Sequence, residues 1–418
     1  MPVFIMPLTT NGRPPVLDSS AELRSPASNG ASLLPEDVGL VHDWLPVYAG
    51  AERVLEQMIH VFPEASVYSL IDFIDEGQRG FLQGRPVETS FLQRLPFAER
   101  GYRYYLPLAP YAIEQFDLSD HDVIVSSSYA VAKGVLTRAD QLHISYVHSP
   151  IRYAWDLYHD PAHGQRRGLR GAIARLVLHY LRFFDVMTVP RVDVFVANSR
   201  HVAQRIWKTY RRQAHVIYPP VDLERFTMTT DKEDYYLAMS RLVPYKRMDL
   251  IVDAFTEMPD KELIVIGDGP EYAALKRRAG PNVTMLGYQP NEAVTHYMEH
   301  ARAFVFAAEE DFGIVAVEAQ ACGTPVIAYG RGGVKETIVP GETGVFFQQQ
   351  TSDHLQAAVR SFEQLEPSFD AEVIRHNAER FGHSVFKKAF SDLVRSAYTT
   401  FQNEYEQEAI APSLVPHS

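Results

Sequence analysis

The feature that most constrains the fold is a pair of successive series of short apolar runs, rich in β-branched residues and separated by amphipathic stretches. Such runs indicate strands of a parallel sheet that is buried on both faces, because the connecting helices cover those faces. The sequence therefore predicts an α/β protein with two doubly wound, Rossmann-like domains. The expected strands are 38–41, 67–70, 123–126, 143–146 and 192–197 in the first series, and 235–239, 262–266, 283–286, 303–307 and 325–328 in the second.

Two adjacent prolines, Pro219 and Pro220, interrupt the strand and helix pattern between the two series. Proline suits neither a helix interior nor a central strand, so we expect the domain boundary close by, near residue 225. The last helical segment has no strand after it and is expected to pack back across the first domain. The expected divisions are a disordered leader rich in Pro, Ser, Asn and Gly (1–35), the first domain (36–225), the second domain (226–383), the crossover helix (384–408) and a tail (409–418).

Composition excludes several classes of protein. The formal net charge of −12 argues against general nucleic-acid binding. Cys322 is the single cysteine, which rules out an intramolecular disulfide and a metal site built from cysteines. No apolar run approaches the roughly 20 residues that span a bilayer, and Met1–Thr10 does not resemble a signal peptide. We therefore expect a cytoplasmic protein, either soluble or peripheral on the inner face of the membrane.

The segment Glu310–Ala319 carries the most informative pattern. It follows an expected strand and opens a helix, where free backbone amides suit a diphosphate. Glu310 and Glu318 are eight residues apart, about 12 Å along a continuous helix, which exceeds the roughly 5 to 9.5 Å between glycosidase carboxylates. In the simplest alternative, Glu310 interacts with the positive end of the helix dipole and Glu318 is a solvated helix residue. Because Glu318 lies in an apolar stretch where an unpaired carboxylate is costly, we expect a polar ligand instead.

Two cations follow the first strand of the second series. Arg241 and Lys246 are five residues apart on an expected βα loop, from which both can reach a diphosphate. Gly267 and Gly269 follow the next strand, although any tight turn can use two glycines. Taken alone, these cations would be ordinary surface charges. Their position at a strand end favours a phosphate-binding role.

The pattern E-D-F-G-x4-E-A at 310–319, continued by Gly332 and Gly333, resembles the signature of the family 4 retaining glycosyltransferases, which have the GT-B fold. The resemblance covers roughly 36–400 and implies a cleft between the two domains. It also implies that Glu310 contacts the transferred sugar and Glu318 the nucleotide ribose. The implied diphosphate and nucleobase contacts are the backbone amides after Phe312 at Gly313 and Ile314, the cations Arg241 and Lys246, the turn glycines Gly267 and Gly269, and Tyr288 beside the base. At the glycine that usually follows the lysine, this chain has Arg247, which leaves the loop shape open.

The first domain resembles the same family less closely. Gly50 lies in what is similar to the glycine-rich donor loop, with Ala49 where a second glycine is usual. His148 matches the histidine that approaches the transferred sugar, although a lone histidine is more often structural. Asp43 is expected either to orient the acceptor or to cap a helix. These segments, together with the stretch around Arg152, look most like WbaZ-type bacterial mannosyltransferases, which implies GDP-mannose as donor and a polyprenyl-diphosphate-linked saccharide as acceptor.

The stretch 164–182 is basic and has apolar residues at helical spacing. It fits a helix on an anionic membrane surface or beside a diphosphate-lipid acceptor, with Arg166, Arg167 and Arg170 on the acceptor side. An ordinary core-facing helix with a charged outer face fits equally well.

The resulting prediction is a retaining glycosyltransferase for lipopolysaccharide or exopolysaccharide synthesis that needs no metal and no cofactor, because no Asp-x-Asp occurs in a suitable loop. A GT-B-fold nucleotide-sugar epimerase remains an alternative. So does a non-catalytic nucleotide-sugar-binding subunit, for which the altered positions Ala49 and Arg247 would argue. Front-face attack and a covalent intermediate both remain open as the route to retention.

Overall fold

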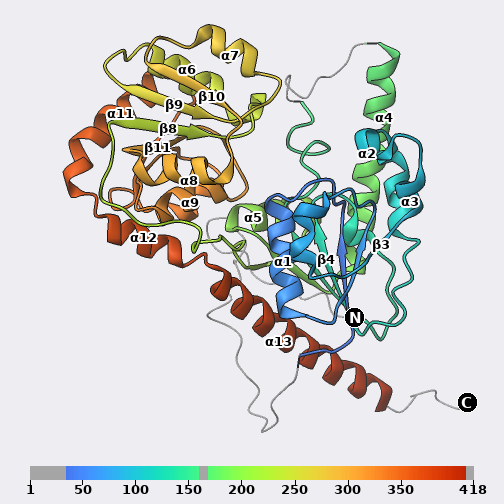
Figure 1. Ribbon diagram of the computed structural model, residues 1–418. Coiled ribbons are helices and arrows are strands. Elements are labelled where there is room, and N and C mark those ends of the chain that lie inside the picture. The colour runs from blue at the N-terminus through green and yellow to red at the C-terminus, as the bar shows by residue number, and fades with distance from the viewer. Residues whose placement is uncertain (1–33, 160–167, 411–418) are drawn as a thin grey trace, which may run out of the picture. The chain divides into compact units, whose positions relative to one another are not determined.

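The computed structural model describes residues 34–159 and 168–410, and the chain forms two compact units (Figure 1). The first unit extends to Ile217 and takes up the chain again from Phe386, and the second comprises Tyr218–Val385. The division therefore lies before the two prolines, a few residues earlier than the boundary expected near residue 225. Both units are built on parallel sheets, which confirms the predicted α/β class.

The first unit contains a sheet of seven parallel strands in the order β3-β2-β1-β4-β5-β6-β7. The direction of strand succession reverses between β1 and β4, as in a Rossmann-like fold. The sequence missed β3 and β7, which are short. The strands are β1 (Val38–His42), β2 (Ser66–Ser69), β3 (Val87–Thr89), β4 (Val123–Ser128), β5 (Leu142–Val147), β6 (Val194–Ala197) and β7 (His215–Val216).

Helices cover both faces of this sheet because successive strand residues point to opposite sides. Leu40 of β1 packs in the cluster that contains α1 (Gly50–Val61), whereas the next residue, Val41, packs with α3 (Ala109–Ile113). The other helices of the unit are α2 (Ala98–Gly101), α4 (Leu169–Met187) and α5 (Arg200–Tyr210).

The long helix α13 (His383–Ile410) returns the chain to the first unit (Figure 1). Its aromatic residues enter the core on the α1 side. The Phe386 ring lies 6.0 Å from that of Tyr146, and Phe390 lies 6.2 Å from Phe62. This C-terminal helix therefore supplies part of the first unit's hydrophobic core.

The second unit has six parallel strands in the order β10-β9-β8-β11-β12-β13, with the reversal between β8 and β11. The strands are β8 (Tyr235–Met239), β9 (Glu262–Ile266), β10 (Val283–Gly287), β11 (Ala303–Phe306), β12 (Val326–Tyr329) and β13 (Gly344–Phe347). One face carries α6 (Met248–Thr256), α7 (Tyr272–Arg278) and α11 (Ser352–Leu365), and the other carries α8 (Asn291–His300) and α9 (Ile314–Ala321) (Figure 1). Two further helices are α10 (Val334–Thr337) and α12 (Ala371–Glu379).

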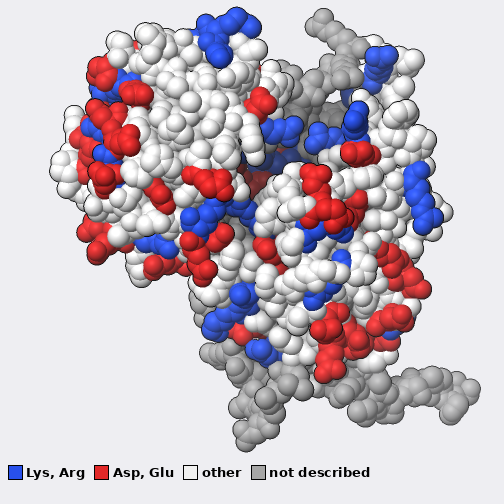
Figure 2. Space-filling view, in the orientation of Figure 1, with Lys and Arg blue, Asp and Glu red and all other residues white. Residues whose placement is uncertain are grey.

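Short 3-10 helices occupy several connections. They are η1 (Glu76–Leu82), η2 (Phe91–Arg94), η3 (Tyr102–Leu108), η4 (Ala132–Gly134), η6 (Val189–Arg191), η7 (Pro244–Lys246) and η8 (Glu366–Ser368). Within the described ranges no helix is both long enough and apolar enough to cross a bilayer. Figure 2 shows acidic and basic side chains interspersed over each unit, so the net negative charge does not form one acidic field on the face shown.

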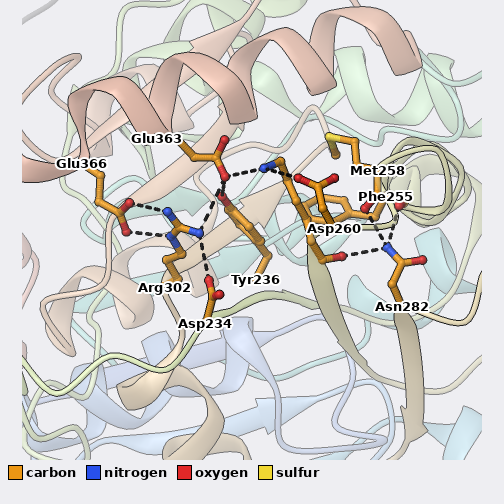
Figure 3. A network of polar contacts seen from close by, with 10 residues as sticks. Asp234, Tyr236, Phe255, Met258, Asp260, Asn282, Arg302, Glu363 and Glu366 are labelled. Atoms are coloured by element: carbon orange, nitrogen blue, oxygen red, sulfur yellow. Dashed lines mark hydrogen bonds and ion pairs between the residues drawn. The ribbon is translucent and has the colours of Figure 1, made fainter.

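A network of charged residues fixes α11 to the second sheet (Figure 3). Arg302 binds both carboxylate oxygens of Glu366, at 2.8 and 2.6 Å, and one oxygen of Asp234 at 2.9 Å. Glu363 accepts hydrogen bonds from Lys261 at 2.6 Å and from the Tyr236 hydroxyl at 3.1 Å. Three of these residues directly precede β8, β9 and β11, so the network lies at the amino edge of the sheet. It is a structural feature, opposite the edge where ligands bind in such folds.

Candidate active site

The predicted donor residues of the second unit all follow strands at the carboxyl edge of its sheet. Arg241 and Lys246 come after β8, Gly267 and Gly269 after β9, and Tyr288 after β10. Glu310 follows β11, which neighbours β8 at the point where the strand order reverses. This is where open α/β sheets bind ligands.

The contact at the centre of this edge is an ion pair between the Lys246 ammonium and the Glu310 carboxylate. Both side chains are largely shielded, with 19% and 17% of their surface exposed. Gly333 donates its backbone N–H to the Glu310 carbonyl at 2.8 Å. A Cβ at Gly332, whose φ is +78°, would lie 2.3 Å from that carbonyl oxygen, so glycine is required for this close approach.

Glu310 does not lie on the helix that carries Glu318, and the expectation of one continuous helix through both residues is wrong. Helix α9 begins at Ile314, after Gly313 with a φ of +87°. That left-handed residue separates the Glu310 loop from the helix, so the 12 Å estimate does not apply. Glu318 is buried within α9 at 5% exposure. The Phe312 side chain lies in the core, with its ring 5.3 Å from that of Phe381, and only its backbone is left for a ligand.

The two turn glycines shape the loop that carries Arg241. A Cβ on Gly267 would lie 1.9 Å from the Ser240 carbonyl oxygen, and one on Gly269 would lie 2.4 Å from that of Leu242. Their backbones also take φ values of +137° and +155°. The Arg241 side chain is exposed and makes no ion pair within the described part of the chain. It is therefore available to an anion.

Arg247 occupies the position where the family has glycine, and it takes the left-handed conformation itself, with φ 54° and ψ 37°. Its guanidinium is held by Asp249 at 3.2 Å and by Gln350 at 3.3 Å. The loop therefore keeps a glycine-like backbone, at a cost of about 1 kcal/mol for a side chain in that region. Tyr288 is 79% exposed beside this edge of the sheet.

In the first unit, Asp43 follows β1 and is fully buried. Its Oδ2 accepts the backbone N–H groups of Tyr129 and Ala130 at 2.6 and 2.8 Å, and its Oδ1 accepts those of Val131 and Ala132 at 2.6 and 2.7 Å. Burial raises the pKa of the Asp43 carboxyl, and these amides oppose the rise. Because both oxygens are engaged, the geometry favours the capping role over acceptor orientation.

His148 follows β5 and is half-buried. Its Nε2 lies 2.9 Å from Ser127 Oγ, which in turn lies 3.0 Å from Nδ1 of His42. Burial, reinforced by the nearby His42, lowers the pKa of His148 to about 3, so the ring is neutral near pH 7. Sequence reasoning missed His42 and Ser127 as site residues. The available signal was their position at the ends of the first and third expected strands.

Gly50 is the first residue of α1, and Ala49 precedes it in an extended conformation. Glu52 closes the helix start, because its Oε2 accepts the Ala49 N–H at 3.0 Å. An extended backbone suits alanine as well as glycine, so the Ala49 substitution leaves this turn unstrained.

The acceptor-side residues are only partly described. Arg152 is half-buried in the turn after β5, and Arg170 is exposed on α4. Arg166 and Arg167 lie outside the described residues, as do 1–33 and 411–418 of the expected leader and tail. Within the described ranges, no three His, Cys, Asp or Glu side chains gather in a metal-binding arrangement.

Comparison with known proteins gives matches to both units. The model of Glycosyltransferase Family 4 matches residues 48–225, and that of Glycosyl transferases group 1 matches 222–381. A relative from Mycolicibacterium smegmatis, named GDP-mannose-dependent alpha-(1-6)-phosphatidylinositol monomannoside mannosyltransferase, is 32% identical over 201 residues, 40% of this chain and 52% of that protein. A D-inositol 3-phosphate glycosyltransferase from Geodermatophilus obscurus is 28% identical over 267 residues, 55% and 58% of the two chains.

Among solved structures, Anabaena HepE in complex with UDP superimposes with a TM-score of 0.63 at 17% identity, covering 86% of this chain and all of that one. The outer core galactosyltransferase WaaB gives a TM-score of 0.59 at 18% identity, covering 87% and 99% of the two chains. These likenesses confirm the GT-B fold. The chain matches about half the length of the curated relatives named above. The two family models match different parts of the chain, one in each unit, so each unit is similar to glycosyltransferases of these families.

Proposed function

We propose that the protein transfers a sugar from a nucleotide-sugar donor to an acceptor with retention of configuration, without a metal or cofactor. The observation that carries the proposal is the Lys246–Glu310 ion pair, with Arg241 exposed on the loop that also carries Lys246. Two cations can neutralise the leaving diphosphate, and a carboxylate beside them can accept hydrogen bonds from sugar hydroxyls. The departing phosphate then takes the acceptor's proton in a front-face attack.

The finer proposal is mannose transfer from GDP-mannose to a lipid-linked oligosaccharide in bacterial surface polysaccharide synthesis. Its support is the resemblance of the first unit to WbaZ-type enzymes and the name of the Mycolicibacterium relative. The Ala49 and Arg247 positions, which could have marked a non-catalytic subunit, keep the backbone conformations that their loops need. They therefore favour an enzyme over a binding subunit.

The test is nucleotide release from GDP-, UDP- and ADP-sugars, with and without bacterial lipid extract. We expect release from GDP-mannose that rises when lipid is added. Release from another donor would keep the transferase and reject mannose. Isomerisation of the sugar without acceptor would identify an epimerase, and tight nucleotide binding without turnover would identify a binding subunit.

Helix α4 supports peripheral membrane association, because its apolar stripe faces solvent. Residues spaced alternately by four and three form one side of the helix. The core-facing alternative fails for four of the five apolar residues read from the sequence, because Leu169, Ile173, Leu176 and Tyr180 are each at least 42% exposed, whereas Val177 is partly buried. Phe183 and Met187 continue the exposed stripe, and another side of α4 faces the core through Leu181 and Phe184. The acidic residue of α4, Asp185, is buried, whereas Arg170 and Arg175 are exposed.

Apolar residues flanked by arginines fit an anionic lipid surface. Replacing Leu176 and Phe183 by glutamate is expected to lower binding to vesicles that contain anionic lipid at least about tenfold, because each side chain contributes roughly 1.5–3 kcal/mol when buried. Vesicle flotation measures this binding. The double replacement of Leu365 and Val373 by glutamate, on exposed sites of the second unit, is the matched control. Unchanged flotation of the α4 variant would contradict the proposal.

A further inference from the structure

Four polar side chains of the first unit lie in one line that ends at His148. Glu52 Oε1 is 3.5 Å from His42 Nε2, His42 Nδ1 is 3.0 Å from Ser127 Oγ, and Ser127 Oγ is 2.9 Å from His148 Nε2. The first three side chains are buried, with residue exposures of 4%, 0% and 1%. His148 is mostly buried but keeps some exposed surface. The line therefore leads from a buried carboxylate to a ring that a ligand can reach.

The sheet itself holds this line in place. Strand β4 lies between β1 and β5, and His42 is the register partner of Ser127. His148 directly follows β5, and its backbone N–H binds the Ser128 carbonyl at 2.9 Å. Parallel strand pairing thus fixes the separations between the three side chains, and a local loop movement would not disturb them.

The order of donors and acceptors follows from the carboxylate end. The contact between Glu52 and His42 is a charge proximity at 3.5 Å, and His42 Nε2 makes no hydrogen bond in the described ranges. The negative charge of an ionised carboxylate still favours a proton on the nitrogen that faces it, Nε2. The proposal takes His42 with its single proton on Nε2, and in that state His42 Nδ1 accepts from the Ser127 hydroxyl at 3.0 Å. Ser127 Oγ is left to accept, and the proton between Ser127 and His148 must lie on His148 Nε2.

We propose that Glu52, His42 and Ser127 are positioning residues that hold His148 as its Nε2–H tautomer, so that Nδ1 accepts a hydrogen bond from a hydroxyl of the donor sugar. The tautomer is a property of the free protein, whereas the sugar contact rests on the proposed function. No residue in the described ranges forms a hydrogen bond with His148 Nδ1. This nitrogen is also not fully buried, so a ligand can reach it. The lone pair is therefore open to a ligand.

The first experiment reads the tautomer of His148 directly. The free protein is labelled with ¹⁵N-histidine, and two-bond nitrogen–proton correlation spectra distinguish Nε2–H from Nδ1–H rings. His148→Gln assigns the signal among the 16 histidines. We expect Nε2–H in the unmodified protein. An Nδ1–H ring would overturn the proposal.

Glu52→Gln tests the direction of the line. The Ala49 N–H holds one side-chain oxygen of residue 52, so glutamine keeps its oxygen there and turns its NH₂ toward His42. A donor at that end favours a proton on His42 Nδ1, which reverses the hydrogen bonds from His42 to Ser127 and from Ser127 to His148, and His148 is expected to change to the Nδ1–H form. Glu56→Gln, the same charge change on the same helix, should leave the tautomer unchanged. Ser127→Ala breaks the line and should populate both tautomers. If neither Glu52→Gln nor Ser127→Ala changes the tautomer of His148, the proposal is wrong.

The second experiment reads the polarity of the sugar contact. Binding affinities are measured for monodeoxy and monofluoro analogues of the accepted nucleotide sugar, with the protein and with His148→Ala. The hydroxyl that contacts His148 is the one whose removal and the His148→Ala replacement cause losses of binding free energy that do not add. At that hydroxyl, the fluoro and the deoxy analogue should lose the same affinity, because fluorine cannot donate a hydrogen bond. A fluoro analogue that keeps the affinity would show that His148 donates, which is the opposite of the proposal. If no nucleotide sugar binds at all, the proposed function fails while the tautomer result stands.

Discussion

Glu310→Gln is expected to lower the turnover of the preferred nucleotide sugar by about 100-fold or more, the usual effect of removing one preorganised polar group that acts in the transition state. Glutamine keeps the size and a hydrogen-bonding oxygen but loses the charge that pairs with Lys246. Binding of the free nucleotide diphosphate should change less than about threefold, because Glu310 is expected to contact the sugar. Steady-state rates and calorimetric affinities measure the two effects.

Lys246→Met separates the two members of the pair. It should weaken the affinity for the nucleotide diphosphate as well as the turnover, since the ammonium is expected to contact the diphosphate. Glu342→Gln, an exposed glutamate of the same unit, is the control and should change neither quantity. Equal losses of nucleotide affinity in Glu310→Gln and Lys246→Met would contradict separate roles and would show that the ion pair serves only to shape the loop.

Much of the fold could be predicted because strands buried on both faces are largely apolar. The run 262–266 coincides with β9, whose four residues after the exposed Glu262 are apolar and buried. The edge strand β3 (Val87–Thr89) was missed because it is short and partly exposed, so its Glu88 and Thr89 interrupt the apolar pattern. The apolar pattern of a strand reflects its burial, so the pattern is weaker in a strand that is partly exposed to solvent.

The sequence allowed single site residues to be predicted, but it did not allow the contacts between them to be predicted. The positions of Glu310 and Lys246 after strands could be read from their own neighbourhoods. Their contact depends on β8 lying beside β11, far away in sequence. The line from His42 through Ser127 to His148 likewise depends on the order β1-β4-β5. Strand order and register are set by the packing of the whole unit, so a local pattern does not reveal them.

The interior of the first unit contains a second polar group that the sequence did not reveal. Lys133 Nζ lies 2.7 Å from Asp185 Oδ1 and 2.8 Å from Thr188 Oγ1. The same carboxylate accepts hydrogen bonds from Trp155 Nε1 at 2.7 Å and from the Tyr210 hydroxyl at 2.9 Å. The lysine and aspartate side chains are 2% and 0% exposed. This cluster ties η4, α4, α5 and the turn after β5 together.

Lys133→Met is expected to lower the free energy of unfolding of the first unit by about 3–5 kcal/mol, because it leaves the Asp185 charge buried without its counter-ion. Adding Asp185→Asn removes that charge and should recover part of the loss, because the amide oxygen can still accept from Trp155. Lys208→Met, at an exposed lysine of α5, should cost less than about 0.5 kcal/mol.

Urea unfolding followed by tryptophan fluorescence can measure these changes for one unit alone. The three tryptophans, Trp44, Trp155 and Trp207, all lie in the first unit, so their emission reports its unfolding even where the second unit unfolds separately. The opposite result is a double variant that is less stable than Lys133→Met. It would show that Asp185 stabilises the unit mainly as a hydrogen-bond acceptor for Trp155 and Tyr210, and that the charge of Lys133 has little influence on stability. Recovery in the double variant would instead show that the charge balance between Lys133 and Asp185 governs the stability of this interior.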